Sequence, residues 1–413
     1  MMLHHDFRNT GSSMKVLLFS ILLAHLGYYM ILPILPIYLK LNKALNVAEI
    51  GLILAAGSFS FQAASVVGGV LADRIGRRTI IALGAVIRGA GFAGYALFQP
   101  FWALMAMALL NGLGGGFNAP ATKAAIAALA SDTEKKTTAF SLRGIAANIG
   151  TSLAGLLAYF VLGGSSPLIF YVSAGLFVFL AVISWYYIPK NCGEKPCPII
   201  PAKSYSQIVR NKAFVVFSLI SVLIWALYTQ LALAIPLRAA AILPDPSIVS
   251  LIWTINSIIA ILLQAPVSAW LLNKIQPMYA LALGIVFIGA GISSLYWSRN
   301  FYGLAASGAT FIIGEMLIMP TMDSTVSRLA TAQMIGVFFG LANFISGLGE
   351  GAGNYTGGLL LSFGIRSPIP WAVYAVSSVV IIVLLVALRF WRPMRMAMGD
   401  HQHSNLNEKG GVE

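Results

Sequence analysis

The sequence predicts an all-α membrane protein whose twelve transmembrane helices form two pseudo-symmetric six-helix bundles. Of its 413 residues, 58% are hydrophobic and 9% are charged, whereas a soluble domain carries roughly 25% charged residues. Long apolar runs recur along the whole chain, and the second half repeats the pattern of the first. A soluble enzyme is excluded, because one water-facing core could not hide so much apolar surface.

The apolar runs are long enough to cross the hydrocarbon, which takes roughly 20 helical residues each. The connections carry turn chemistry, as at 163–167 and 243–246. Unpaired backbone is excluded in lipid and no period-two alternation appears, so helices are expected and a barrel is not. The expected spans are 15–37, 47–72, 79–98, 101–125, 141–163, 167–188, 213–240, 247–272, 278–298, 301–325, 335–363 and 370–390.

The charges predict the orientation of these spans. The chain has 26 Lys+Arg against 13 Asp+Glu, a net charge of +13. Alternating the loops places 20 of the 26 basic residues on the side of the N-terminus, so the positive-inside rule predicts that both termini are cytoplasmic. The net charge is then a consequence of topology and not a nucleic-acid footprint. The first apolar run is full length and has no small-residue cleavage site, so it is expected to remain as helix 1.

The longest internal connection, 189–212, is rich in proline and basic residues. It predicts a cytoplasmic linker between an N-terminal bundle, 1–188, and a C-terminal bundle, 213–392, followed by a disordered cytoplasmic tail, 393–413. Its two cysteines, Cys192 and Cys197, would lie in a reducing compartment, and no partner ligands accompany them. Neither a disulfide nor a metal site is expected, and no cofactor is implied.

A shift of 200 residues superimposes the two halves. It carries 81–91 onto 281–291 with seven of eleven positions identical, and it brings Pro120 onto Pro320. One register that serves several elements indicates a true repeat. Repeated six-helix halves that face each other across a central cavity are typical of alternating-access transporters.

Between helices 2 and 3 lies a ten-residue motif, 69–78. Its glycines suit close helix approach, its acid can accept hydrogen bonds, and its arginines offer donors to carboxylates, helix ends or headgroups. The motif resembles the G-x-L-A-D-R-x-G-R-R signature of the major facilitator superfamily, in which this loop is a latch between the halves. The resemblance implies the same role here, although the arginines could instead only enforce topology. The latch residues would be Gly69, Asp73, Arg74, Gly76, Arg77 and Arg78.

Within that superfamily, the sequence 314–320, with Gly314-Glu315 and the later Pro320, resembles a branch of bacterial drug:proton antiporters that export multiple drugs. Two features differ from those antiporters. Ala108 stands at the usual arginine position of helix 4, and helix 5 has Gly150 and Gly155 but no Gly-Pro pair.

Four ionisable residues fall near the centres of their spans: His25, Arg88, Glu315 and Glu350. Each costs roughly 2.5–3.5 kcal/mol or more at membrane depth, so each needs a reason. A carboxyl in such a place favours its neutral form and is suited to bind and release a proton. Glu315 and Glu350 are therefore the proton-coupling candidates, with Glu315 first because it matches the antiporter motif. The alternative is a structural carboxylate that bonds another helix.

Glu350 shares one helical face with Asn343, Gly347 and Asn354. This stripe could bind substrate, relay protons or join helix 11 to a neighbour. Arg88 could be a counter-ion or could pack against helix backbone, and a satisfied interior histidine is the alternative for His25. The residues expected to line a substrate cavity are His25, Arg88, Tyr228, Asn256, Asn343 and Asn354.

These observations predict a secondary active transporter of the bacterial plasma membrane that works as a monomer. It would export small amphipathic or cationic compounds by proton antiport, with the proton gradient as its energy source. A dedicated exporter of a secreted metallophore or peptide-like metabolite, or an importer, is the nearer alternative. An intramembrane enzyme or a channel would need a convergent catalytic set or a filter, and neither pattern is found.

Overall fold

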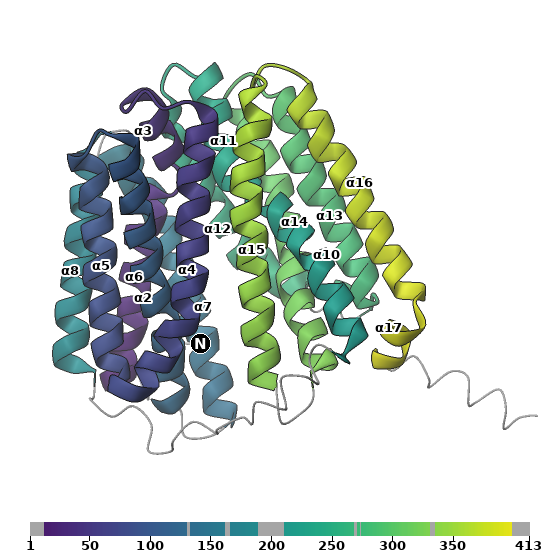
Figure 1. Cartoon of the computed structure of the whole chain (residues 1–413), viewed down its shortest axis with the longest axis horizontal. Helices are drawn as coiled ribbons and strands as arrows, with labels where there is room; N and C mark the ends of the chain where they lie inside the picture. The colour runs from purple at the N-terminus through teal and green to yellow at the C-terminus, as the bar shows by residue number, and fades with distance from the viewer. Residues whose placement is uncertain are drawn as a thin grey trace, which may run out of the picture.

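A computed structural model describes residues 12–129, 133–161, 166–188, 210–267, 271–272, 274–330 and 335–398. In these ranges twelve long helical segments stand side by side in two groups, which confirms the predicted all-α fold (Figure 1). Most of the predicted linker, with Cys192 and Cys197, lies outside the described residues, as do residues 399–413. The described chain begins and ends at the same edge of the helix layer (Figure 1).

The N-terminal half supplies six of the long segments. The first is broken between two helices by the Pro33 and Pro36 region. The last turn of the fifth is π-helical. In chain order the elements are α2 (Ser12–Ile31), α3 (Leu35–Leu41), α4 (Val47–Ile75), α5 (Arg77–Leu97), α6 (Phe101–Leu129), α7 (Thr133–Leu156), η1 (Leu157–Val161) and α8 (Leu168–Tyr187).

The C-terminal half supplies the other six segments, and its first helix is also broken, at Thr229. In chain order the elements are α10 (Lys212–Tyr228), α11 (Gln230–Ile242), η2 (Pro246–Val249), α12 (Ser250–Val267), α13 (Pro277–Ser293), η4 (Ser294–Tyr296), α14 (Phe301–Leu329), α15 (Ile335–Ser362), α16 (Ile369–Phe390) and α17 (Arg392–Ala397). The last of these replaces the start of the predicted disordered tail. Residues 393–397 are helical because Met394 packs into the core and is only 1% exposed.

Local sequence explains where helices begin and turn. Asn46 starts α4 with a capping box, in which its side chain accepts from the Glu49 backbone and the Glu49 carboxylate accepts from the Asn46 backbone, both at 2.9 Å. Gly76 separates α4 from α5 with φ at +99°. Residues with a Cβ rarely adopt that conformation, so the sharp turn depends on glycine.

Nine of the described segments are long and apolar enough to span a membrane, and the chain is a multi-pass membrane protein. The remaining long helices, α6, α7 and α15, contain many glycines and polar residues and are 29, 24 and 28 residues long. Aromatic side chains project from helix ends, including Trp102, Tyr186 and Tyr302 at 75–80% exposure. Such rings are typical of the membrane interface.

The 200-residue repeat is visible in equivalent contacts. A Cβ added to Gly84 would lie 2.6 Å from the Gly114 carbonyl oxygen, and one added to Gly284 would lie 3.0 Å from the Gly314 carbonyl oxygen. Both pairs therefore bring two helix backbones together, α5 with α6 and α13 with α14. The shift derived from sequence thus places the same close approach in both halves.

A cation also caps the same helix end in each half. Lys43 donates to the carbonyls of Ala96 at 3.3 Å and Phe98 at 2.7 Å. Arg238 donates to the carbonyls of Tyr296 at 2.8 Å and Ser298 at 3.2 Å, which are the positions that a shift of 200 predicts. These carbonyls have no intrahelical partner at a helix C-terminus, so the side chains satisfy them.

The halves meet at one end of the molecule, opposite the described termini. A Cβ on Gly51 of α4 would lie 2.7 Å from the Gly358 Cα of α15, so the two backbones touch there. On the other pair of helices, Thr254 of α12 donates to the Ser152 carbonyl of α7 at 2.8 Å. Toward the end of the described termini, a Cβ on Gly340 would have nothing within 4 Å. The halves are therefore closed at one end, and the cavity between them extends toward the other, open end, where Thr122 and Arg143 line it.

Candidate functional site

A cavity of about 540 Å³ lies between the two halves. Its lining comes from α2 to α8 on one side and from α10, α11, α12, α14 and α15 on the other. A volume of several hundred cubic ångströms suits a drug-sized molecule. This cavity is the candidate functional site.

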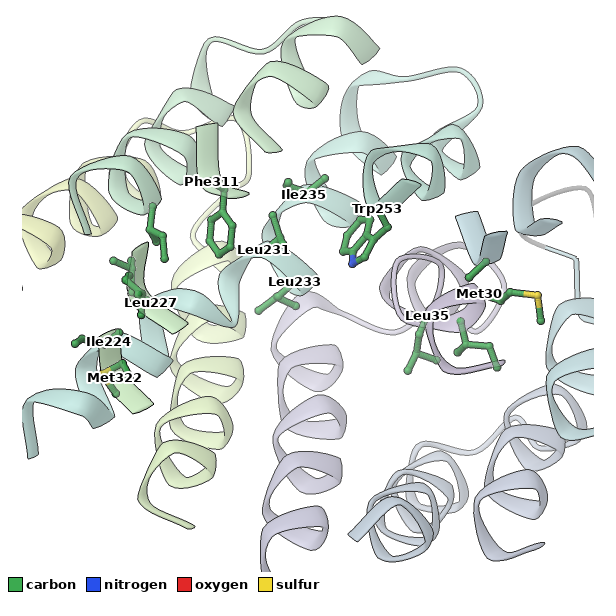
Figure 2. Packing of buried hydrophobic residues seen from close by; sticks show 14 of the residues in the cluster. Met30, Leu35, Ile224, Leu227, Leu231, Leu233, Ile235, Trp253, Phe311 and Met322 are labelled. Atoms are coloured by element: carbon green, nitrogen blue, oxygen red, sulfur yellow. The ribbon is translucent and has the colours of Figure 1, made fainter. Parts of the chain in front are cut away.

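The closed end of the cavity is apolar. Leu35 of α3, Leu231 of α11 and Trp253 of α12 line it, and each is at most 9% exposed. Figure 2 shows Trp253 facing Met30 and Leu35 of the other half. Because these three side chains carry no charge, they can separate without leaving an ion pair broken.

Glu315 lies on the C-terminal wall of the cavity. The Tyr228 hydroxyl donates to its carboxylate at 3.0 Å. The tyrosine is the last residue of α10, at the helix break, and its ring packs edge-on against Trp225 with centroids 5.0 Å apart. The Gly314 backbone is pressed against α13, which places the next residue on the side of α14 that borders the cavity. Pro320 lies within α14, which remains a single helix.

Glu350 and Asn354 of α15 line the same cavity. The Asn354 amide accepts from the Thr229 hydroxyl at 3.2 Å and donates to the Ser58 hydroxyl, also at 3.2 Å. The second bond crosses between the halves. Asn343, which the sequence places on the same face, is exposed and does not line the cavity. It lies eleven residues from Asn354, toward the end of the molecule that carries the termini.

The N-terminal wall is basic and aromatic. The His25 ring stacks on Tyr29, with centroids 5.5 Å apart. The Arg88 guanidinium carbon lies 4.3 Å from the Tyr28 ring centroid. Among the described residues no ion pair joins this arginine to Glu315 or Glu350, so the counter-ion alternative does not hold in this conformation.

Asn256 of α12 is another cavity residue that the sequence predicted. Its side chain is 5% exposed, and neither its amide nitrogen nor its amide oxygen has a protein partner. Both atoms face the gap beside Gly308 of α14, where a Cβ would come within 3.6 Å of them. A buried amide without partners is costly, and in this conformation packing against α14 closes both atoms off from the cavity.

The cavity lining includes many residues outside the predicted site, among them Tyr29, Asn111 and Trp253. Tyr29 lies close enough to interact electrostatically with Glu315 and Glu350 across the cavity. Asn111 is a polar residue inside an apolar span, and that signal alone could have identified it. Tyr29 and Trp253 could not be separated from lipid-facing aromatics, since both faces of their helices are apolar.

The predicted latch residues lie at the turn between α4 and α5, at the open end. Arg77 donates to the Ala124 carbonyl at 2.9 Å, and the Arg78 guanidinium carbon lies 4.6 Å from the Trp185 ring centroid. Arg74 is exposed. The close approach expected at Gly69 instead belongs to Gly68, whose added Cβ would lie 2.9 Å from the Gly116 carbonyl oxygen, whereas one at Gly69 would meet nothing. The one-residue difference is a rotation of about 100° around α4.

In the described ranges, no group of three or more His, Cys, Asp or Glu could hold a metal ion. The groups available for chemistry are the two carboxylates, the basic wall and the uncharged polar side chains. They can bind organic ions and protons.

Comparison with known proteins identifies the architecture. The family described as the Major Facilitator Superfamily matches residues 17–354. The chain is 25% identical over 382 residues to the multidrug resistance protein MdtH of Citrobacter koseri, covering 92% of this chain and 94% of that protein. It is 24% identical over 391 residues to the protein of the same name from Edwardsiella ictaluri, covering 94% and 96%.

Solved structures share the fold. The nucleoside transporter NupG superimposes with a TM-score of 0.77 at 16% identity, covering 92% of this chain and 100% of that chain. The peptide transporter POT in complex with sulfate superimposes with a TM-score of 0.74 at 19% identity, covering 91% and 93%.

Proposed function

Because this chain belongs to the Major Facilitator Superfamily and is a secondary transporter, not an enzyme, we propose that it exports small amphipathic or cationic organic compounds in exchange for protons. The distant similarity to MdtH proteins supports drug efflux. The single observation that carries the proposal is the position of Glu315, whose carboxylate lies in the central cavity and accepts a hydrogen bond from Tyr228 at 3.0 Å.

A carboxylate in this cavity has two ways to be neutralised. It can take a proton, or it can pair with a cationic substrate. One carboxylate cannot bind a proton and pair with a cationic substrate at the same time. A proton that arrives from one side of the membrane therefore displaces the substrate toward that side. Glu350, also in the cavity, is the second proton-coupling candidate, with His25, Arg88, Tyr228, Asn256 and Asn354 as substrate contacts.

Alternating access requires that the closed end open and the open end close. The closed end supports the first step, since glycine backbones, apolar side chains and a few uncharged hydrogen bonds join the halves there. The motif at 69–78 supports the second step. Gly69, Asp73, Arg74, Gly76, Arg77 and Arg78 would act as a latch when the end that carries the motif closes.

The basic residues and the bacterial relatives support a location in the bacterial plasma membrane. With both termini in the cytoplasm, the open end in this structure faces inward and is the side from which cargo would enter. We propose a monomer with an N-terminal bundle, 1–188, a linker, 189–212, and a C-terminal bundle from 213, in contact with lipid, protons and substrate and with no cofactor.

Efflux measurements test the proposal. Cells that express wild type or Glu315→Gln are loaded with a fluorescent cationic drug, and efflux is followed with and without a protonophore. Wild type should export the drug in a gradient-dependent manner. The gradient-dependent efflux rate of the variant should be at least about tenfold lower, because one carboxylate would no longer exchange its proton.

Asp323→Asn provides the matched control, because this carboxylate lies on the same helix but is exposed and outside the cavity lining. It should retain gradient-dependent efflux. Equal gradient-dependent efflux from wild type and Glu315→Gln would remove Glu315 from coupling.

A further inference from the structure

The Arg88 guanidinium lines the cavity without a carboxylate partner among the described residues. Its neighbours are aromatic rings: the guanidinium carbon lies 4.3 Å from the Tyr28 centroid and 5.5 Å from the Phe177 centroid. Its Nε is buried and has no hydrogen-bond partner. Aromatic faces offset only part of the cost of a cation at membrane depth. The remaining donors of this side chain have capacity for an anion.

The neighbouring helix is shaped to make room for this cation. A Cβ on Gly115 of α6 would lie 2.9 Å from Arg88 Nη1, so only glycine leaves the guanidinium in place. One turn away on the same helix, Asn111 has a buried amide nitrogen with no partner, and it also lines the cavity. Arg88 and Asn111 thus belong to one cavity wall on adjacent helices, and each keeps a buried donor without a partner.

The cavity wall formed by the C-terminal half carries acidic residues, whereas the wall formed by the N-terminal half carries basic ones. Glu315 and Glu350 come from the C-terminal half, whereas Arg88, His25 and Arg143 come from the N-terminal half, and all line one cavity. The repeat relates the two walls, because a shift of 200 residues carries Gly115 onto Glu315. Where the C-terminal half has a carboxylate, the N-terminal half has the space that a guanidinium fills.

We propose that Arg88 and Asn111 form a subsite for an anionic group of the cargo, so that the preferred substrates are zwitterionic amphiphiles. Their carboxylate is held by the N-terminal wall, and their amine faces the carboxylates of the C-terminal wall. A guanidinium that bonds a carboxylate does so with two parallel donors, and Asn111 lines the wall beside it. This inference rests on the proposed export function and narrows its substrate class.

Two matched fluorescent probes test the subsite. Dansylcadaverine is an aromatic amine, and Nε-dansyl-L-lysine is the same molecule with a carboxylate on the carbon that bears the amine. Binding of each to the purified full-length protein in detergent is measured by fluorescence, with no gradient. Wild type should bind dansyl-lysine at least about tenfold more tightly than dansylcadaverine. Equal binding of the two probes by wild type would overturn the proposal.

Arg88→Gln should remove that difference in affinity. It should weaken the binding of dansyl-lysine at least about tenfold, while dansylcadaverine binds as before. Arg299→Gln, which removes an exposed loop arginine, should leave both affinities unchanged. An equal loss for both probes in Arg88→Gln, or no loss for either, would overturn the proposal. If Arg88→Gln does not fold, Asn111→Ala is measured in its place. This variant should weaken the binding of dansyl-lysine alone by severalfold. An equal effect on the binding of both probes would overturn the subsite.

The binding assay separates this inference from the proposed function. Loss of gradient-dependent efflux in Glu315→Gln concerns coupling and can hold whether or not dansyl-lysine is preferred. Conversely, a carboxylate preference that depends on Arg88 can be present in a protein that does not exchange protons.

Discussion

Tyr228 and Glu315 are joined by a hydrogen bond of 3.0 Å at the point where the first helix of the C-terminal half breaks. The tyrosine ends α10, and Gln230 begins α11 one residue beyond the break. A change in the protonation of the carboxylate therefore acts directly on the end of a helix whose continuation, α11, borders the closed end of the cavity. This contact offers a route from proton binding to movement.

Tyr228→Phe should uncouple transport while leaving the protein folded. The change removes one hydrogen bond to a carboxylate, an interaction worth about 1.5–3 kcal/mol, so gradient-driven transport should fall by roughly tenfold or more. Transport in liposomes with an imposed pH gradient measures the effect.

The matched control is Tyr302→Phe, which removes the hydroxyl of a tyrosine that is 80% exposed. It should transport like wild type. If both variants behave alike, the bond to Glu315 has no role in coupling.

Gly68→Ala should destabilise the protein by about 1–3 kcal/mol, because the new methyl group would overlap the α6 backbone near Gly116. Gly69→Ala should instead be neutral or stabilising by up to about 1 kcal/mol, since its Cβ meets nothing and alanine favours helix. Thermal unfolding of the purified variants checks both values. A larger loss of stability for Gly69→Ala than for Gly68→Ala would show that α4 is rotated differently about its axis.

Gly51→Trp should prevent closure of the end at which α4 and α15 touch, because an indole cannot fit against the Gly358 backbone. Transport should fall at least about tenfold, since one of the two alternating states is lost. Leu52→Trp, one residue along and partly exposed, is the control and should transport normally.

The state of that end can be read from thiol labelling. In a Cys192→Ser, Cys197→Ser background, Ser58→Cys should react with an impermeant reagent from the side opposite the termini only when Gly51→Trp is also present. Equal labelling with and without the tryptophan would contradict the closed end described above.

Arg238→Met should cost about 1.5–3 kcal/mol or more of the free energy of unfolding, because three backbone carbonyls lose a charged donor. Lys43→Met should cost less, since two carbonyls are affected. Thermal unfolding in detergent measures both, with Arg299→Met as the exposed control. An Arg238 variant as stable as wild type would mean that water satisfies these carbonyls.

The sequence predicted the all-α class, the repeat and the position of four ionisable residues near the centres of their membrane spans. Glu315 was identifiable because a carboxylate in lipid is rare and must be explained. The repeat was identifiable because each half uses glycines at equivalent close contacts between helices, as Gly84 and Gly284 show. These properties depend on position along a helix, which sequence periodicity records.

Other properties depend on distances between helices, which periodicity does not record. Asn343 shares a helical face with Asn354, yet it is exposed and does not line the cavity. The break at Thr229 has no proline at that residue, and Pro236 lies inside α11. The pairing of Arg88 with Tyr28 could not be derived, since nothing in the spacing of α2 and α5 fixes their rotation about each other.

The capping cations have an electrical consequence. Lys43 and Arg238 each bond carbonyls of their own half, so each travels with that half as it rocks and changes little in depth. Moving one elementary charge through the full membrane potential is worth about 2.3 kcal/mol per 100 mV. These two fixed cations therefore contribute little voltage dependence, and any current that accompanies turnover must come from the cargo, the protons and the side chains that face them.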